Sequence, residues 1–412
     1  MTRDAIPTGG ALRRATAPEA RPVLVIGATG TFGQRLARHL SRNPRVRLLV
    51  GIRCADRGWE LANRLVHDAV VPPEVVQVDT TDRLEATLAQ LRPWCVIDCT
   101  GPFQESDHSL PRAALRAGAH VIDIADAPSY LCEFEKALDP LAKHQDLVAI
   151  GGASSTPCLS GAAVAALASS LHEIHDIEMV IAPGGRGDVG PAVIDAILGY
   201  AGKPVPAWLG GKLAYLIGWR GAITRHIDGL GRRRCVPVQS FDPEYLGPNF
   251  GVRGSVVFRA ALESLPEQVG LEVLAAARSL WPGWDLRLLA PLLTRLRQIT
   301  KLGTSDVGAM EVRVRGVDFD RRETEATWRL LARRGDGPVV PILPAAAAVQ
   351  SLLEQRIGAG ATLATRALSL DEIVAQMSAY AITTRIEVHS GAKPSMPSDS
   401  ETPARARHAE LA

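Results

Sequence analysis

The stretch from residue 22 to residue 151 alternates short, almost wholly apolar runs with segments of helical periodicity. Apolar runs of this kind are typical of strands that helices cover on both faces, and the alternation is typical of βαβ units. Strands are predicted over residues 23–26, 46–52, 75–78, 95–99, 120–124 and 147–150. Helices are predicted over residues 34–41, 58–68, 83–91, 110–117 and 133–144. The sequence therefore predicts an α/β fold with a parallel sheet.

The first predicted strand leads directly into a glycine-spaced turn, Gly27-Ala-Thr29-Gly30-Thr31-Phe32-Gly33. A bound diphosphate needs main-chain N–H groups at a helix N-terminus, and a Cβ atom would obstruct its approach. A plain strand-to-helix turn would also use such glycines, but the βαβ units around it favour a dinucleotide site in a Rossmann-type, doubly wound sheet. The predicted cofactor-binding residues here are Gly27, Thr29, Gly30, Thr31, Phe32 and Gly33.

The second predicted strand is followed by Arg53, with Arg57 close behind. NAD-dependent enzymes usually have an acidic residue in this place, which binds the ribose 2′-hydroxyl. Because a guanidinium suits a 2′-phosphate, the sequence predicts NADP(H) rather than NAD(H) as the cofactor. Asp79, after the third strand, is a candidate acceptor for the adenine amine, although a simple Asx turn would also explain it.

Three further loops follow the carboxyl ends of predicted strands, where doubly wound folds bind their ligands. Thr100, Gly101, Pro102 and Phe103 are expected to line the nicotinamide ribose, and Ser154 is expected to contact the cofactor. Asp126 is the first candidate for transferring a proton or orienting a substrate. A helix N-cap is the alternative role for this carboxylate. Asp123 is expected near the same site.

Cys158 precedes an apparent helix, and a helix N-terminus lowers the pKa of a thiol. A nucleophilic Cys158 would indicate semialdehyde chemistry, whereas packing among small residues is the ordinary role of such a cysteine. The six cysteines and the histidines show no metal-ligand spacing, so no metal site is predicted and a reduced, cytoplasmic setting is expected. Short-chain dehydrogenase chemistry is disfavoured, because none of the five tyrosines has a lysine four residues later.

The length of 412 residues allows two domains, and the formal net charge of +2 disfavours a nucleic-acid partner. We predict disordered tails at residues 1–21 and 389–412, and a cofactor domain at 22–151. Residues 152–340 are predicted to form an α+β substrate and dimerisation domain, with an antiparallel hairpin at 310–317 and 325–332. Late helices within 341–388 are predicted to pack back on the first domain. A small-molecule substrate and a homodimer are expected.

Several motifs in a fixed order resemble the saccharopine dehydrogenase-like oxidoreductases. These are the glycine turn, Asp98-Cys-Thr-Gly-Pro-Phe103, the segment 117–126, Gly151-Gly-Ala-Ser-Ser-Thr-Pro157 and Gly335-Asp-Gly-Pro338. The resemblance spans most of the chain and implies an NADP-binding Rossmann domain followed by a mixed substrate domain. Departures from the family pattern are Cys158, where relatives often have glycine, and residues 105–107, which replace a glycine-containing turn.

The function expected from these features is hydride transfer between NADP(H) and a C=N, C=O or activated C=C bond of a small molecule. A non-catalytic NADP-binding sensor or subunit is one alternative. A trans-acting enoyl reductase of lipid assembly and a cysteine-dependent semialdehyde reductase are others. No apolar stretch is long enough to span a membrane, although the apolar segment 192–219 leaves peripheral membrane contact open.

Overall fold

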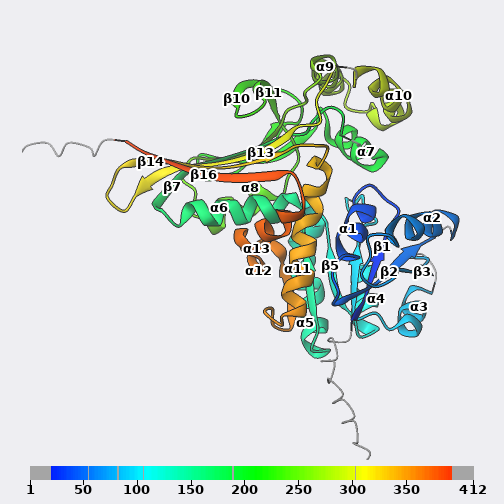
Figure 1. Ribbon diagram of the computed structural model, residues 1–412. Coiled ribbons are helices and arrows are strands. Elements are labelled where there is room, and N and C mark those ends of the chain that lie inside the picture. The colour runs from blue at the N-terminus through cyan, green and yellow to red at the C-terminus, as the bar shows by residue number, and fades with distance from the viewer. Residues whose placement is uncertain are drawn as a thin grey trace, which may run out of the picture.

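The computed structural model describes residues 20–53, 55–80, 83–104, 106–187, 190–301 and 303–391. Two sheets organise these residues (Figure 1). The first sheet contains the N-terminal strands, and the second is a longer mixed sheet that extends away from it. The predicted combination of a Rossmann-type parallel sheet and a second α+β unit is confirmed.

The first sheet is parallel throughout and has the strand order β15-β6-β5-β4-β1-β2-β3. Its strands are β1 (Arg21–Ile26), β2 (Val46–Ile52), β3 (Glu74–Gln77), β4 (Cys95–Asp98), β5 (His120–Asp123), β6 (Val148–Gly151) and β15 (Gly360–Leu363). The first six lie within one or two residues of their predicted positions. The strand order reverses between β1 and β4, and this switch point is where doubly wound folds bind dinucleotides.

Helices flank the first sheet, which explains why its strands are apolar on both faces (Figure 1). They are α1 (Gly33–Leu40), α2 (Ala55–Leu65), α3 (Leu84–Leu91), α4 (Ser109–Arg116) and α5 (Pro128–His144). Leu24, Leu48 and Ile97 are among the side chains that have no solvent exposure. Burial of each such side chain contributes roughly 1.5–3 kcal/mol, so the sheet is a rigid base for the loops at its edge.

The second sheet has the order β10-β11-β12-β7-β13-β14-β16, with β8 and β9 attached beside β12. Its strands are β7 (Leu171–Ala182), β8 (Pro204–Leu209), β9 (Lys212–Ile217), β10 (Ile223–Ile227), β11 (Gly231–Pro237), β12 (Ser255–Ala260), β13 (Gly308–Asp318), β14 (Glu323–Ala332) and β16 (Ile382–Ser390). Only the pair β7 and β12 is parallel among the described pairings. The predicted hairpin is confirmed as β13 and β14.

The helices of the second domain are α6 (Ser160–Ala168), α7 (Pro191–Tyr200), α8 (Asp242–Asn249), α9 (Leu265–Leu280) and α10 (Ala290–Thr300). α6 packs against β7, β13 and β14. Met179, Val312 and Trp328 belong to the buried core on this side of the sheet. One face of the sheet is therefore closed by α6 and is continuous with the core of the first domain.

The C-terminal segment contains late helices, as predicted, together with two strands that the prediction lacked. It contains α11 (Leu343–Leu353), α12 (Ala364–Ala367) and α13 (Leu370–Ala375), and it also adds β15 to the first sheet and β16 to the second. The four residues of β15 carry too short a pattern to be recognised, and β16 is a largely polar edge strand. The predicted tails were also drawn too long, since Arg21 begins β1 and Ser390 ends β16. Residues 1–19 and 392–412 lie outside the described residues.

Candidate functional site

The glycine turn after β1 is shaped by close contacts that exclude side chains. Gly27 has a φ of 77°, and a Cβ atom added there would lie 2.8 Å from the carbonyl oxygen of Cys99. A Cβ atom on Gly33 would lie 2.2 Å from the carbonyl oxygen of Gly27. These contacts bring the start of α1 against the turn and the turn against the end of β4. Both positions therefore require glycine for steric reasons.

The same turn presents main-chain donors at the N-terminus of α1. Gly30 N donates to the Gly27 carbonyl oxygen at 2.9 Å, which closes the turn. Within the described part of the chain, the N–H groups of Thr31 and Phe32 donate to no backbone acceptor. Unsatisfied N–H groups at a helix start, with no Cβ in front of them, suit the diphosphate of a dinucleotide. The residues present therefore fit such a cofactor.

Two buried carboxylates hold the neighbouring loops in place at the same edge of the sheet. Thr100 donates to Asp98 Oδ1 from its N–H at 2.8 Å and from its hydroxyl at 2.7 Å. Asp123 Oδ1 accepts from the N–H of Gly152 at 2.8 Å and from that of Ala125 at 3.0 Å. The loops after β4, β5 and β6 are thus positioned by hydrogen bonds to Asp98 and Asp123.

Asp123 itself is a fully enclosed carboxyl group. Burial raises the pKa of Asp123 to about 7, while its two main-chain donors and the Tyr130 hydroxyl, 3.0 Å from Oδ2, favour the charged form. The negative charge of Asp98 raises the pKa further. Asp123 was predicted near the site, and its oxygens are occupied by protein donors. Its role in the structure is to hold these loops.

The titration of Asp123 predicts a pH-dependent stability. Because the folded-state pKa lies above the ordinary value of about 3.9, the folded state binds more protons between these two values. The stability that Asp123 contributes should therefore fall as the pH rises toward about 7. Denaturant titrations of wild type and Asp123→Asn between about pH 5 and 8 should show their difference in unfolding free energy falling by about 1 kcal/mol per pH unit. A constant difference would contradict this assignment.

Asp126 lies on the loop after β5 and meets the second domain. Its side chain is exposed to solvent, yet the protein around it is dense enough that desolvation raises its pKa. A hydrogen bond from the side chain of Gln104 acts in the opposite direction. The charge of Asp126 in turn contributes to raising the pKa of Tyr200 at the end of α7, where burial is the larger cause. An accessible carboxyl group with a raised pKa is suited to proton transfer.

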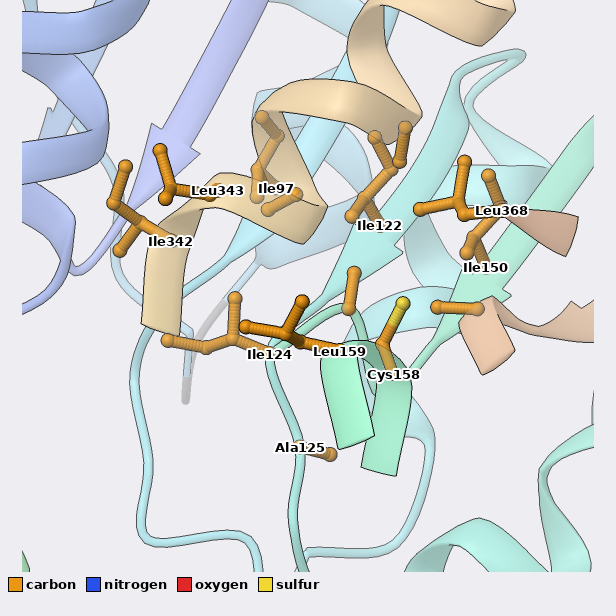
Figure 2. Close-up of a cluster of buried hydrophobic side chains, with 14 of the residues drawn as sticks. Ile97, Ile122, Ile124, Ala125, Ile150, Cys158, Leu159, Ile342, Leu343 and Leu368 are labelled. Carbon is orange, nitrogen blue, oxygen red and sulfur yellow. The ribbon is translucent and has the colours of Figure 1, made fainter. Parts of the chain in front are cut away.

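The burial of Cys158 disfavours the alternative of a nucleophilic cysteine. Figure 2 shows its sulfur among apolar side chains that include Ile122, Ile150 and Leu368. Cys158 has no solvent exposure, and burial raises the pKa of its thiol, with the charge of Asp242 adding to the shift. The helix start cannot produce a reactive thiolate there because no water reaches the group. Packing is the role that the structure supports.

The other predicted residues are distributed along the same sheet edge. Arg53 is exposed after β2, and its carbonyl oxygen accepts from Gln77 Nε2 at 3.5 Å. Asp79 is exposed after β3, and Ser154 is buried after β6. The ring of Phe103 packs on Tyr130, with centroids 5.6 Å apart, so only its main chain is available to a ligand. Their roles in cofactor binding stay predictions.

Sequence reasoning missed the contribution of the second domain to this site. Gly190, at the start of α7, lies so close to the glycine turn that an added Cβ atom would be 2.1 Å from Thr31 Oγ1. Tyr200, at the other end of α7, interacts electrostatically with Asp126. No local pattern could reveal these contacts, because they depend on how the two domains pack. Over the described ranges, no cluster of three or more ligating side chains could hold a metal ion.

Comparisons with known proteins agree with this geometry. The sequence model described as "Saccharopine dehydrogenase NADP binding domain" matches residues 23–150. A 4-hydroxy-tetrahydrodipicolinate reductase from Ruegeria pomeroyi is 31% identical over 158 residues, which cover 38% of this chain and 55% of that protein. The match thus spans about half the length of this curated relative.

Among solved structures, saccharopine dehydrogenase (L-Glu forming) from Saccharomyces cerevisiae has a similar fold, with a TM-score of 0.63 and 13% identity. The similarity covers 89% of this chain and all of that one. The parallel sheet, its switch point and the glycine turn define a Rossmann-type dinucleotide-binding domain. Residues 23–150 match the saccharopine dehydrogenase NADP-binding domain family, and the fold of the chain is similar to that of saccharopine dehydrogenase.

Proposed function

We propose that this protein is an NADP(H)-dependent oxidoreductase that transfers a hydride between the nicotinamide and a C=N, C=O or activated C=C bond of a small molecule. The observation that carries the proposal is the glycine turn, where close main-chain contacts exclude any Cβ atom and N–H groups are left for a diphosphate. The named reductase and dehydrogenase relatives support the same type of reaction. When bound, the nicotinamide supplies the hydride.

The chain's own residues provide binding, orientation and a proton. The turn from Gly27 to Gly33 would bind the diphosphate, and Arg53 would bind the 2′-phosphate. Asp126, with its raised pKa and exposed carboxyl group, would deliver a proton to the substrate atom that becomes negative during reduction. A substrate held between the loop of Asp126 and α7 would be oriented by both domains.

The experiment that tests this function is a titration of NADPH followed by an oxidation assay. We expect NADPH to bind and its absorbance to fall in the presence of at least one member of a panel of imines, ketones, semialdehydes and enoyl thioesters. Binding without oxidation across the whole panel would favour a non-catalytic sensor or subunit instead. The absence of NADPH and NADH binding would refute both.

Arg53 provides the test of cofactor preference. Because its guanidinium would pair with the 2′-phosphate, Arg53→Ala is expected to weaken NADPH binding by at least about tenfold and to leave NADH binding nearly unchanged. The matched control is Arg47→Ala on the same strand, since Arg47 lies toward the opposite edge of the sheet and pairs with Glu74 at 2.9 Å. Isothermal titration with both cofactors measures the effect. Equal affinity of Arg53→Ala and wild type for NADPH would disprove the role.

A further inference from the structure

Two adjacent helices of the second domain, α9 and α10, carry a high density of exposed apolar side chains. They lie side by side at one end of the molecule (Figure 1). Of the nineteen large apolar side chains that are exposed in the described residues, ten lie between residues 265 and 299. These ten are Leu265, Val269, Val273, Leu280, Trp281, Trp284, Leu288, Leu292, Leu296 and Ile299. We refer to them as the α9–α10 apolar surface.

The spacing of these residues places them on continuous stripes. Leu292, Leu296 and Ile299 follow one another at intervals of four and three residues on one face of α10, and Leu288 lies four residues earlier in the 3₁₀ turn before it. On α9, positions 265, 269, 273 and 280 repeat at intervals of four, four and seven. Trp281 and Trp284 lie on the turn between the helices, and both are exposed. The surface therefore spans two helices and their connection.

α10 exposes several large apolar side chains to solvent, namely Leu292, Leu296 and Ile299. No described residue of α10 is buried. Its inward contacts include Ala290 and Leu293, which pack against the main core. Arg297 adds polar contacts by donating to Glu267 Oε2 at 2.8 Å and to the carbonyl oxygens of Gly185 and Gly187 at 3.2 Å. The Arg297 side chain is only 15% exposed, whereas Leu292 and Ile299 are 54% and 66% exposed. α10 therefore presents a second apolar stripe outward, in addition to the apolar residues that pack on the core.

Basic side chains surround this surface. Between residues 278 and 301 the sequence has five arginines and lysines and one acidic residue, Asp285, which pairs with Arg287 at 3.1 Å. Arg278 and Arg297 are largely buried, which leaves Arg287, Arg295 and Lys301 beside the surface. Lys203 lies near the same turn, because its pKa is lowered by burial and then by the positive charges of Arg278 and Arg287. Arg295 is exposed on α10. The rim of the surface is therefore positively charged.

We propose that α9, α10 and the turn between them form a membrane-binding surface that lies on an anionic lipid bilayer. Exposed leucines and tryptophans on one side, with arginines and lysines beside them, are the composition of helices that rest in the bilayer interface. The positive rim complements anionic headgroups. A second copy related by a two-fold axis would bring the same basic rim against itself, so charge complementarity favours lipid as the occupant.

The test is co-sedimentation of the full chain with vesicles of phosphatidylcholine alone or with a quarter of phosphatidylglycerol. We expect binding to the anionic vesicles, with weaker binding in high salt. Leu292→Gln/Leu296→Gln should lower the partition coefficient by at least about tenfold without changing the melting temperature, because both side chains are exposed. Trp281→Ala should weaken binding, whereas the matched control Trp59→Ala, which removes a tryptophan exposed on α2, should not.

Results from two measurements would overturn the proposal. One is a failure of the wild-type chain to sediment with anionic vesicles, or equal binding by the double leucine variant. The other is found by light scattering without vesicles. If wild type were a dimer and the double leucine variant a monomer that still binds vesicles, the surface would be a contact between copies of this chain.

Discussion

Gly27→Ala is expected to weaken NADPH binding by at least about tenfold and to lower the free energy of unfolding by a few kcal/mol. Alanine would have to adopt a φ of 77°, and its Cβ atom would lie 2.8 Å from the Cys99 carbonyl oxygen and 3.1 Å from Thr100 N. These neighbours are backbone atoms of the loop that follows β4. They cannot move without displacing this loop at the switch point between β1 and β4. Isothermal titration and thermal denaturation measure the two effects.

Two other glycines separate the cofactor effect from backbone strain. Gly118→Ala requires a φ of 83° with nothing within 4 Å of the new Cβ atom, so it should cost stability and leave NADPH affinity unchanged. Gly30→Ala has one close neighbour, the Gly27 carbonyl oxygen at 3.1 Å, and should fold. Its added Cβ atom should still obstruct the diphosphate. If folded Gly30→Ala bound NADPH as wild type does, the diphosphate could not lie against this turn.

Asp126→Asn is expected to lower kcat by roughly a hundredfold or more and to leave KM nearly unchanged, because an amide cannot donate the proton that reduction requires. For wild type, kcat of reduction should fall as the pH rises through the raised pKa of Asp126, since the donor must be protonated. The variant should lack this limb of the pH profile. The measurement is NADPH oxidation with the best substrate of the panel.

The matched control is Asp107→Asn. Asp107 is an exposed carboxylate on the preceding loop, and the hydrogen bond from Ser109 lowers its pKa. Its substitution should change neither kcat nor the pH profile. A large rise in KM for Asp126→Asn with an unaltered pH profile would show that Asp126 orients the substrate and does not transfer a proton.

The first domain was predictable because its determinants are local. Each apolar run in residues 22–151 is both a strand and a core segment, so one pattern indicated six strands within one or two residues of their observed ends. The glycine turn was equally predictable, because only glycine lacks the Cβ atom that the close contacts in this turn exclude. The strand β15 was missed because its four residues, Gly360–Leu363, show no strand pattern of their own and form a strand by pairing with β6.

The candidate site was less predictable, because burial and domain contact decide it. Cys158 and Asp126 both follow strands in sequence, yet one is enclosed in the core and the other is exposed beside Gln104. The proximity of Tyr200 to Asp126, and of Gly190 to Thr31, results from the packing of α7 on the first domain. These positions are more than seventy residues from their partners, and no periodicity connects them.

The late entry of β15 has a consequence for how the chain folds as it is synthesised. β6 ends at Gly151, but the strand that completes its edge begins at Gly360. Translation of the intervening two hundred or so residues takes on the order of ten to forty seconds, during which the backbone groups at that edge of β6 are unpaired. Such an edge can pair with another chain. Completion of the cofactor-binding sheet therefore waits until residues 360–363 have emerged from the ribosome.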